Sequence, residues 1–159
     1  MKRSLLTVLF ICILASGAWA NDADMRSLQR LMEATRSQGY AQAQTEVTER
    51  SRPLLDRLWK QGVPLFFPQN ITLKKEKAAG DFRYLWVSPK ENPKAGSLIL
   101  AYTNEGGKAK LDLPETFRNG LGENWPKTLD MLEQGYMMAK AQVGDEAALQ
   151  MLQNMMRGQ

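Results

Sequence analysis

Apolar residues recur at helical spacing soon after the N-terminal segment of the chain. Positions three or four residues apart form one apolar face, made of Met25, Leu28, Leu31 and Met32. This periodicity predicts a first helix that Asp24 caps and that ends near Gly39.

A second helical pattern follows over residues 40–61. Ser51 and Pro53 have the residue types of a helix N-cap and first turn, and Gly62 is placed to end that segment. Propensity leaves open whether residues 40–61 form one kinked helix or two. The proline-bounded segment 64–68 is predicted to be an extended connector.

Four segments in the middle of the chain alternate apolar and polar residues with the period of a strand. They lie near 70–77, 82–88, 97–103 and 108–113, and turn residues separate the two members of each pair. The pattern predicts a four-stranded antiparallel meander. If Thr103 pairs with Lys108, one buried face holds Leu98, Leu100, Tyr102, Ala109, Leu111 and Leu113. The opposite face is expected to lie in water and carries Thr103, Lys108, Lys110 and Asp112.

The first hairpin of this meander has two partly apolar faces. Either plausible register puts one aromatic group on the same side as two lysines: Phe82, Tyr84 and Trp86 with Ile71, Leu73, Lys75 and Lys77. Such a face could stack on a sugar or another flat ligand, or bind an anionic headgroup. The alternative, which we favour, is that the aromatic rings belong to the core and the lysine stems lie along its edge.

The last third of the chain returns to helical spacing. Asn124 can cap a helix with Trp125 and Pro126 in its first turn, which we expect to pack across the sheet and to stop near Gly144. A final amphipathic helix follows. The predicted fold class is therefore α+β, with N-terminal helices, a four-stranded antiparallel meander and C-terminal helices packed on the sheet.

The first twenty residues have the order of a secretory signal peptide. Lys2 and Arg3 precede an apolar run over residues 5–18, and Ala18 and Ala20 are small residues suited to signal-peptidase cleavage. The run is shorter than the roughly 20 residues that a transmembrane helix needs. We expect cleavage after Ala20, one α+β domain over 21–159, membrane contact only before cleavage, and a periplasmic or secreted protein.

The amino-acid composition of the segment after residue 20 excludes several kinds of functional site. It contains no cysteine and no histidine, which excludes disulfides, Cys/His zinc sites and histidine-based catalytic triads. Without Lys2 and Arg3 the chain has 19 basic and 17 acidic residues, a net charge of +2. The densest basic run is Lys74, Lys75 and Lys77, interrupted by Glu76. We therefore predict no nucleic-acid partner, no metal and no cofactor.

Methionines concentrate in the last third of the chain. The final helix has an apolar stripe that includes Met151, Leu152, Met155 and Met156. Met151 and Met155 are four residues apart, a spacing that could hold Cu(I), but a core or a partner surface is the favoured interpretation.

Carboxylates are the main groups left for an enzyme, and five lie near the sheet-to-helix junction: Asp112, Glu115, Glu123, Asp130 and Glu133. Their spacing singles out no catalytic pair. The sequence thus favours a non-enzymatic exported binding protein, an accessory, adaptor or inhibitor of another envelope or secreted protein. The alternative is a carrier of a small apolar or aromatic ligand held between sheet and helices.

The signal-peptide hypothesis predicts the mass of the exported protein. Because cleavage follows Ala20, intact-mass spectrometry of exported material should find a chain that begins at Asn21. An uncleaved N-terminus in the membrane fraction would contradict the hypothesis and indicate a tethered protein.

Overall fold

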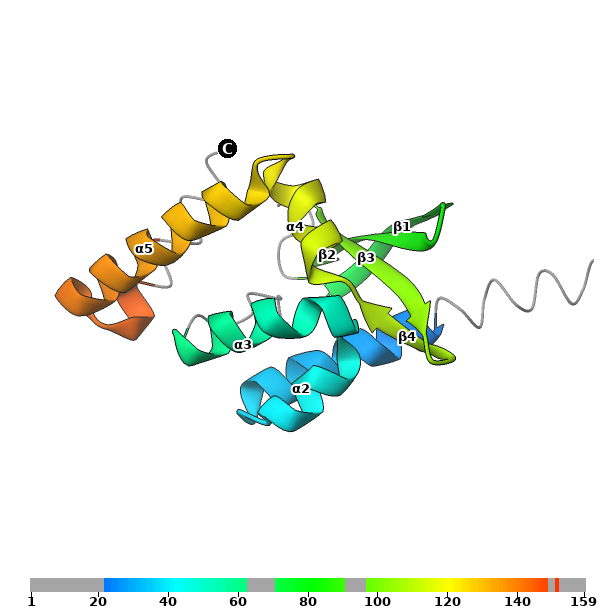
Figure 1. Cartoon of the computed structure of the whole chain (residues 1–159), viewed down its shortest axis with the longest axis horizontal. Helices are drawn as coiled ribbons and strands as arrows, with labels where there is room; N and C mark the ends of the chain where they lie inside the picture. The colour runs from blue at the N-terminus through cyan, green and yellow to red at the C-terminus, as the bar shows by residue number, and fades with distance from the viewer. Residues whose placement is uncertain (1–21, 63–70, 91–96, 149–150, 152–159) are drawn as a thin grey trace, which may run out of the picture.

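The computed structural model describes residues 22–62, 71–90, 97–148 and 151 (Figure 1). A helix over residues 22–36 comes first, and residues 145–148 and 151 are helical at the other end. Between them lie α2 (Tyr40–Glu46), the 3-10 turn η1 (Glu49–Ser51), α3 (Arg52–Lys60), β1 (Ile71–Ala79), β2 (Phe82–Pro89), β3 (Leu98–Glu105), β4 (Lys108–Leu111), α4 (Leu113–Leu121) and α5 (Trp125–Val143).

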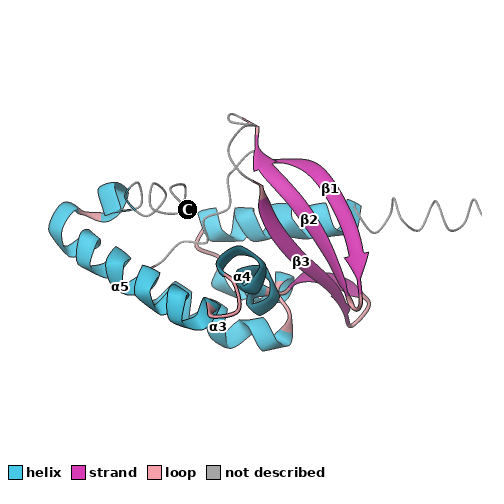
Figure 2. Cartoon of the chain, turned by 90° about the horizontal axis from the view of Figure 1, so that it is seen from above, coloured by secondary structure: helices cyan, strands magenta, loops and turns pink. Residues whose placement is uncertain are grey.

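The predicted α+β class and meander are confirmed. The four strands pair antiparallel in the order β1-β2-β3-β4. The helix over residues 22–36 covers one face of the sheet and α4 lies on the other, which gives three layers (Figure 2). We call these the inner and the outer face. Among the described residues, no helix is both long enough and apolar enough to cross a membrane.

The inner face carries the main hydrophobic core. Leu28 and Leu31 of the first helix pack against alternate residues of the strands, and the fully buried strand members include Leu85, Leu100, Tyr102 and Leu111. This agrees with the predicted buried face of the second hairpin. Each large apolar side chain buried in this way contributes roughly 1.5–3 kcal/mol to folding.

Residues 40–61 form two helices, which resolves the open alternative. α2 ends at Glu46, and Val47 and Thr48 are extended before η1 and α3 begin. Val47 forms a bridge with Leu111, so the break lays the chain along the free edge of β4. Ser51 is the N-cap residue of α3 as predicted, but its hydroxyl accepts the amide N–H of Leu113 rather than capping its own helix.

The predicted cap of the first helix is wrong. Asp24 lies inside the helix, is fully buried, and accepts two hydrogen bonds of 2.7 Å from Arg83 of β2. A carboxylate can be buried only when it is paired, because its loss of hydration is otherwise too costly. The residue that resembled a cap is therefore a tertiary contact between the helix and the sheet.

A β-bulge corrects the predicted faces of the first hairpin. Lys75 and Lys77 pair with Trp86 and Tyr84 as predicted, but the register shifts between Leu73 and Lys75. A shift of one residue moves every following side chain to the opposite face. Ile71 and Leu73 consequently pack against the inner core, not beside the aromatic residues.

The second hairpin turns over Gly106 and Gly107, which both have positive φ (60° and 74°). Positive φ at both central residues is the requirement of a tight type I′ turn, and glycine meets it without strain. Glu105 therefore pairs with Lys108, and Thr103 pairs with Lys110 rather than with Lys108. The slip is of two residues, so the predicted faces are unchanged.

The helix α4 was not predicted, and it changes the outer face. The strand pattern extends to residue 113, but β4 ends at Leu111 and α4 begins at Leu113. α4 then returns over β3, where Ala101 is fully buried and its amide donates to Thr116 Oγ1 at 3.0 Å. The prediction that this face lies in water is wrong beneath α4.

Asp112 is also not in water: only 1% of its surface is exposed. Its Oδ1 accepts from Arg50 Nη2 at 2.7 Å and from the Glu115 amide at 2.9 Å, which caps α4. Its Oδ2 accepts from Arg50 Nε at 2.5 Å and from Thr48 Oγ1 at 2.9 Å. One carboxylate thus joins β4, α4 and η1.

The longest helix, α5, packs on α3 and α4 rather than across the sheet. A second core lies between these helices and includes Leu58, Leu129 and Tyr136. Arg57 of α3 reaches Glu133 at 3.1 Å and Asp130 at 3.2 Å, which aligns the two helices. α5 begins after Asn124 and ends before Gly144, both as predicted.

Because Asp112 has four hydrogen-bond donors around it, replacing it by asparagine should lower the free energy of unfolding strongly. Asp112→Asn keeps the shape but loses the charge that Arg50 needs, so we expect the free energy of unfolding to fall by about 3 kcal/mol. Asp81→Asn makes the same change at an exposed turn residue and should alter it by less than about 0.5 kcal/mol. Urea unfolding measures both, and equal effects would show that Asp112 does not join these elements.

Candidate binding surfaces

The aromatic residues predicted as a binding site form a ladder on the outer face of β2. Phe82, Tyr84 and Trp86 alternate along the strand, with ring centroids 6.1 and 6.5 Å apart. All three are half-buried, and the edge strand β1 lies beside them. The structure therefore brings these predicted residues together with Lys75 and Lys77.

The protein's own side chains already contact this ladder. Lys75 Nζ lies 5.3 Å from the centre of the Trp86 ring, and Arg50 Cζ lies 5.5 Å from that of Phe82. The Tyr84 hydroxyl donates to Glu115 Oε1 at 3.0 Å. A ligand that stacks here would have to displace these groups. Neither hydrophobic core includes these rings, so the prediction that they belong to the core is wrong: they lie half-buried on the outer face, and the protein's own cations cover two of them.

A cavity of about 500 Å³ lies at the end of the ladder, between Phe82 and the Arg50–Asp112 pair. It contains a buried carboxylate, the usual mark of a catalytic acid or base. The four acceptor positions of that carboxylate are all filled by protein donors, so none remains for a substrate or a water molecule. We assign Asp112 a structural role.

The other carboxylates considered for catalysis are also paired with arginine. Glu115 and Glu123 contact Arg118, at 3.0 and 3.8 Å, while Asp130 and Glu133 contact Arg57. Of the five, only Asp112 lines either of the two cavities that the described residues form around the sheet. Within the same residues, no cluster of three acidic side chains could hold a metal ion.

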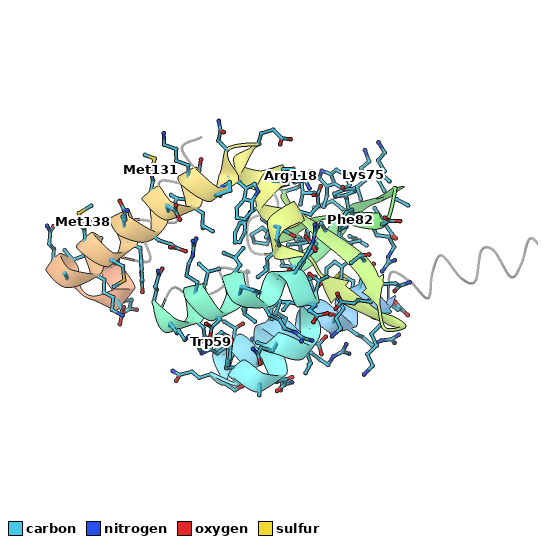
Figure 3. The ribbon with its side chains drawn as sticks, viewed as in Figure 1. Trp59, Lys75, Phe82, Arg118, Met131 and Met138 are labelled. Atoms are coloured by element: carbon cyan, nitrogen blue, oxygen red, sulfur yellow. The ribbon has the colours of Figure 1, made fainter. Side chains whose placement is uncertain are left out.

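The predicted apolar stripe of the final helix is described only at Met151, which is 49% exposed. Leu152, Met155 and Met156 lie outside the described residues. From the apolar periodicity of α5 we predicted only the side of the helix that packs in the core. Exposed methionines on the same helix were not predicted. Met131 is 65% exposed and Met138 is 64% exposed. They are seven residues apart, two helical turns, and both point away from α3 (Figure 3).

A second cavity, of about 600 Å³, was not predicted from the sequence. It lies between the helix over residues 22–36, the start of α3 and β4, and its lining includes five cations: Arg26, Arg30, Arg52, Lys108 and Lys110. They come from three separate parts of the chain, so no basic run marks them. The only local signals are the spacing of Arg26 and Arg30 by one helical turn and that of Lys108 and Lys110 by two strand residues.

Among the described residues that line this cavity, Glu46 is the only one with a carboxylate. It accepts from Ser27 at 2.8 Å and from both Nε and Nη2 of Arg30, at 2.7 and 3.0 Å. Burial raises the pKa of Glu46, but the hydrogen bonds from Arg30 and Ser27 outweigh burial and leave the pKa below its ordinary value of 4.5. Glu46 is therefore charged at neutral pH.

No protein-family model, curated protein or solved structure matches this chain.

The lowered pKa of Glu46 predicts a pH-dependent contribution to stability. The contribution is complete above the unfolded value of 4.5 and is lost as the pH falls through the lower folded pKa. Near neutral pH we expect Glu46→Gln to lower the free energy of unfolding by about 1 kcal/mol, because Arg30 is half exposed and water screens the pair. Urea unfolding should find this difference shrinking in acid. A difference that is constant with pH would contradict the assignment.

Proposed function

We propose that this protein is an exported, non-enzymatic binding protein that acts as an accessory, adaptor or inhibitor of another envelope or secreted protein. It would work in the periplasm or beyond it after cleavage following Ala20. We further propose that the partner binds the outward side of α5 around Met131 and Met138.

The observation that supports this proposal is that the exposed large apolar side chains gather in one region of the protein. Five large hydrophobic side chains are exposed among the described residues, and all five lie on α5 and the helical segment after it: Met131, Met137, Met138, Val143 and Met151. Single exposed hydrophobic residues are ordinary on a protein surface, but their confinement to one region is typical of an interaction site.

The side of α5 opposite Met131 and Met138 packs against α3. Leu129 and Tyr136 are buried against α3, and the single hydroxyl hydrogen of Tyr136 has two acceptors within reach, Asp145 Oδ1 at 3.0 Å and the Gly62 carbonyl at 3.3 Å. Hydrogen bonding to Asp145 and burial raise the pKa of Tyr136, with burial the larger cause, so the hydroxyl stays a donor at neutral pH. The methionines are thus presented on an anchored helix, which limits the entropy that binding costs.

The surroundings of the two methionines indicate the chemistry of the partner. Gln134, Ala141 and Gln142 are exposed and uncharged at neighbouring positions on this side of the helix, and Lys127, one turn before Met131, is an exposed charge at their border. An uncharged apolar helix or groove of another protein fits such a surface better than a charged segment does. The flexible thioether of methionine adapts to the shape of its partner, so affinity need not depend on one rigid fit.

The carrier hypothesis receives less support from the geometry. It requires a pocket shared by Tyr84, Trp86, Leu100 and the long C-terminal helix. Leu100 lies on the inner face, the two aromatic residues lie on the outer face, and α5 packs against α3 and α4. The side chains that would have to surround a ligand are therefore separated by the sheet.

We expect Met131→Asp combined with Met138→Asp to remove the partner without unfolding the protein. Two charges on an apolar contact surface would be buried unpaired in the complex, whereas they remain solvated in the free protein. The measurement is affinity capture from an envelope extract, with a photo-crosslinking residue at position 134 to prove contact at this surface. The partner crosslinked at position 134 in the parent protein should be absent from the double variant's capture.

Gln29→Asp combined with Gln42→Asp provides the matched control, because it adds the same charge at exposed positions away from α5. This control should keep both the partner and the crosslink. Loss of the partner in the control as well, or a crosslink that forms only with this protein's own chain, would contradict the proposed surface. A small apolar molecule retained in native mass spectra would favour the carrier instead.

A further inference from the structure

The basic cavity beside β4 has the features of an anion-binding site. Its lining combines Arg26 and Arg30 of the first helix, Arg52 at the start of α3, and Lys108 and Lys110 of β4. Tertiary folding brings these residues into one concave surface of about 600 Å³. We call this surface the basic groove.

The charge in the basic groove is concentrated well beyond the average of the chain. Five cations and one carboxylate leave a local excess of four positive charges, whereas residues 21–159 together carry a net charge of +2. The carboxylate, Glu46, already has Arg30 and Ser27 as partners. Like charges gathered in this way repel one another, and a bound anion would relieve that repulsion.

Two of the five cations are held in place before any ligand arrives. Arg30 makes two hydrogen bonds to Glu46, and Lys110 Nζ donates to the Thr45 carbonyl. The other three, Arg26, Arg52 and Lys108, are exposed and form no ion pair or hydrogen bond with another described residue. The groove therefore combines two cations that the protein holds in position with three exposed cations that can contact a ligand.

We propose that the basic groove binds an anion that carries two or more phosphate groups. Two phosphate monoesters together carry about −3 to −4 charges near neutral pH, which matches the local excess. The planar fork of arginine suits phosphate oxygens, and the groove supplies three arginines. A cavity of about 600 Å³ also has room for more than a single phosphate ion.

The lining also argues against a single-stranded nucleic acid as the source of these phosphates. Proteins that bind single strands add aromatic side chains on which bases stack. The described residues that line the basic groove include none. A phosphorylated small molecule or a phosphorylated lipid headgroup presents the same chemistry without bases, and the two sources can be separated by experiment.

The test measures two probes on the processed protein. Isothermal titration calorimetry with inorganic tripolyphosphate reports a soluble ligand. Flotation with phosphatidylcholine vesicles, with and without cardiolipin, reports a headgroup, as the difference between the two vesicle types. Binding to either probe should weaken as salt is added, because the contact is electrostatic.

The decisive variant is Arg26→Glu combined with Arg52→Glu. Both side chains are exposed, and glutamate is tolerated on a helix surface and favoured in the first turn of α3, so the fold should be retained. We expect binding to weaken about tenfold or more, since two charged contacts become repulsive. Lys74→Glu combined with Lys90→Glu makes the same charge change at exposed positions outside the groove and should leave binding within about twofold.

Tripolyphosphate binding without vesicle binding would support a soluble phosphorylated ligand, and cardiolipin-dependent flotation would support a headgroup. The proposal is overturned if the parent protein binds neither probe or if both double variants weaken binding equally. A melting temperature measured without ligand confirms that each variant is folded, so that lost binding is not mistaken for unfolding.

Discussion

The buried carboxylate of Asp112 holds together the elements that meet at the end of the sheet. It stops β4, caps α4 through the Glu115 amide, and fixes η1 through Thr48 and Arg50. Around it, the Thr48 amide donates to the Leu111 carbonyl, and the Leu113 amide donates to Ser51 Oγ. A buried carboxylate is tolerated only when all of its hydrogen-bond donors are in place. The end of β4, the start of α4 and the position of η1 therefore depend on one another.

The same physical rule places the first helix on the sheet. Asp24 is fully buried against Arg83, and Glu46 is buried against Arg30 and Ser27. The Tyr102 hydroxyl lies in this polar cluster, and burial strongly raises its pKa, so it remains protonated. Paired charges at the rim of an apolar core add less stability than the core itself does. They nevertheless disfavour other arrangements of the helix on the sheet, because such an arrangement would bury a charge without its partner.

The four candidate sites differ in how many of their polar and apolar groups already have partners within the protein. The aromatic ladder is covered by Lys75 and Arg50, and the carboxylates near the junction are paired with arginine. The outward side of α5 and the basic groove retain groups that the described residues do not satisfy: exposed thioethers on one and exposed guanidinium groups on the other. A protein partner and a phosphorylated ligand would therefore bind to separate parts of the molecule, and one protein could link the two.

Local patterns alone determined the class of the fold, the four strands, the buried face of the second hairpin and the limits of α5, because period and turn chemistry act over a few residues. They could have indicated α4 as well, since Asp112-Leu-Pro-Glu115 has the spacing of a capping box, but strand alternation up to Leu113 obscured it. The bulge beside Leu73, the burial of Asp24 and the basic groove were decided only by tertiary structure. Each depends on residues far apart in the chain, and neither a paired charge nor a shared cavity has any signature in a local sequence window.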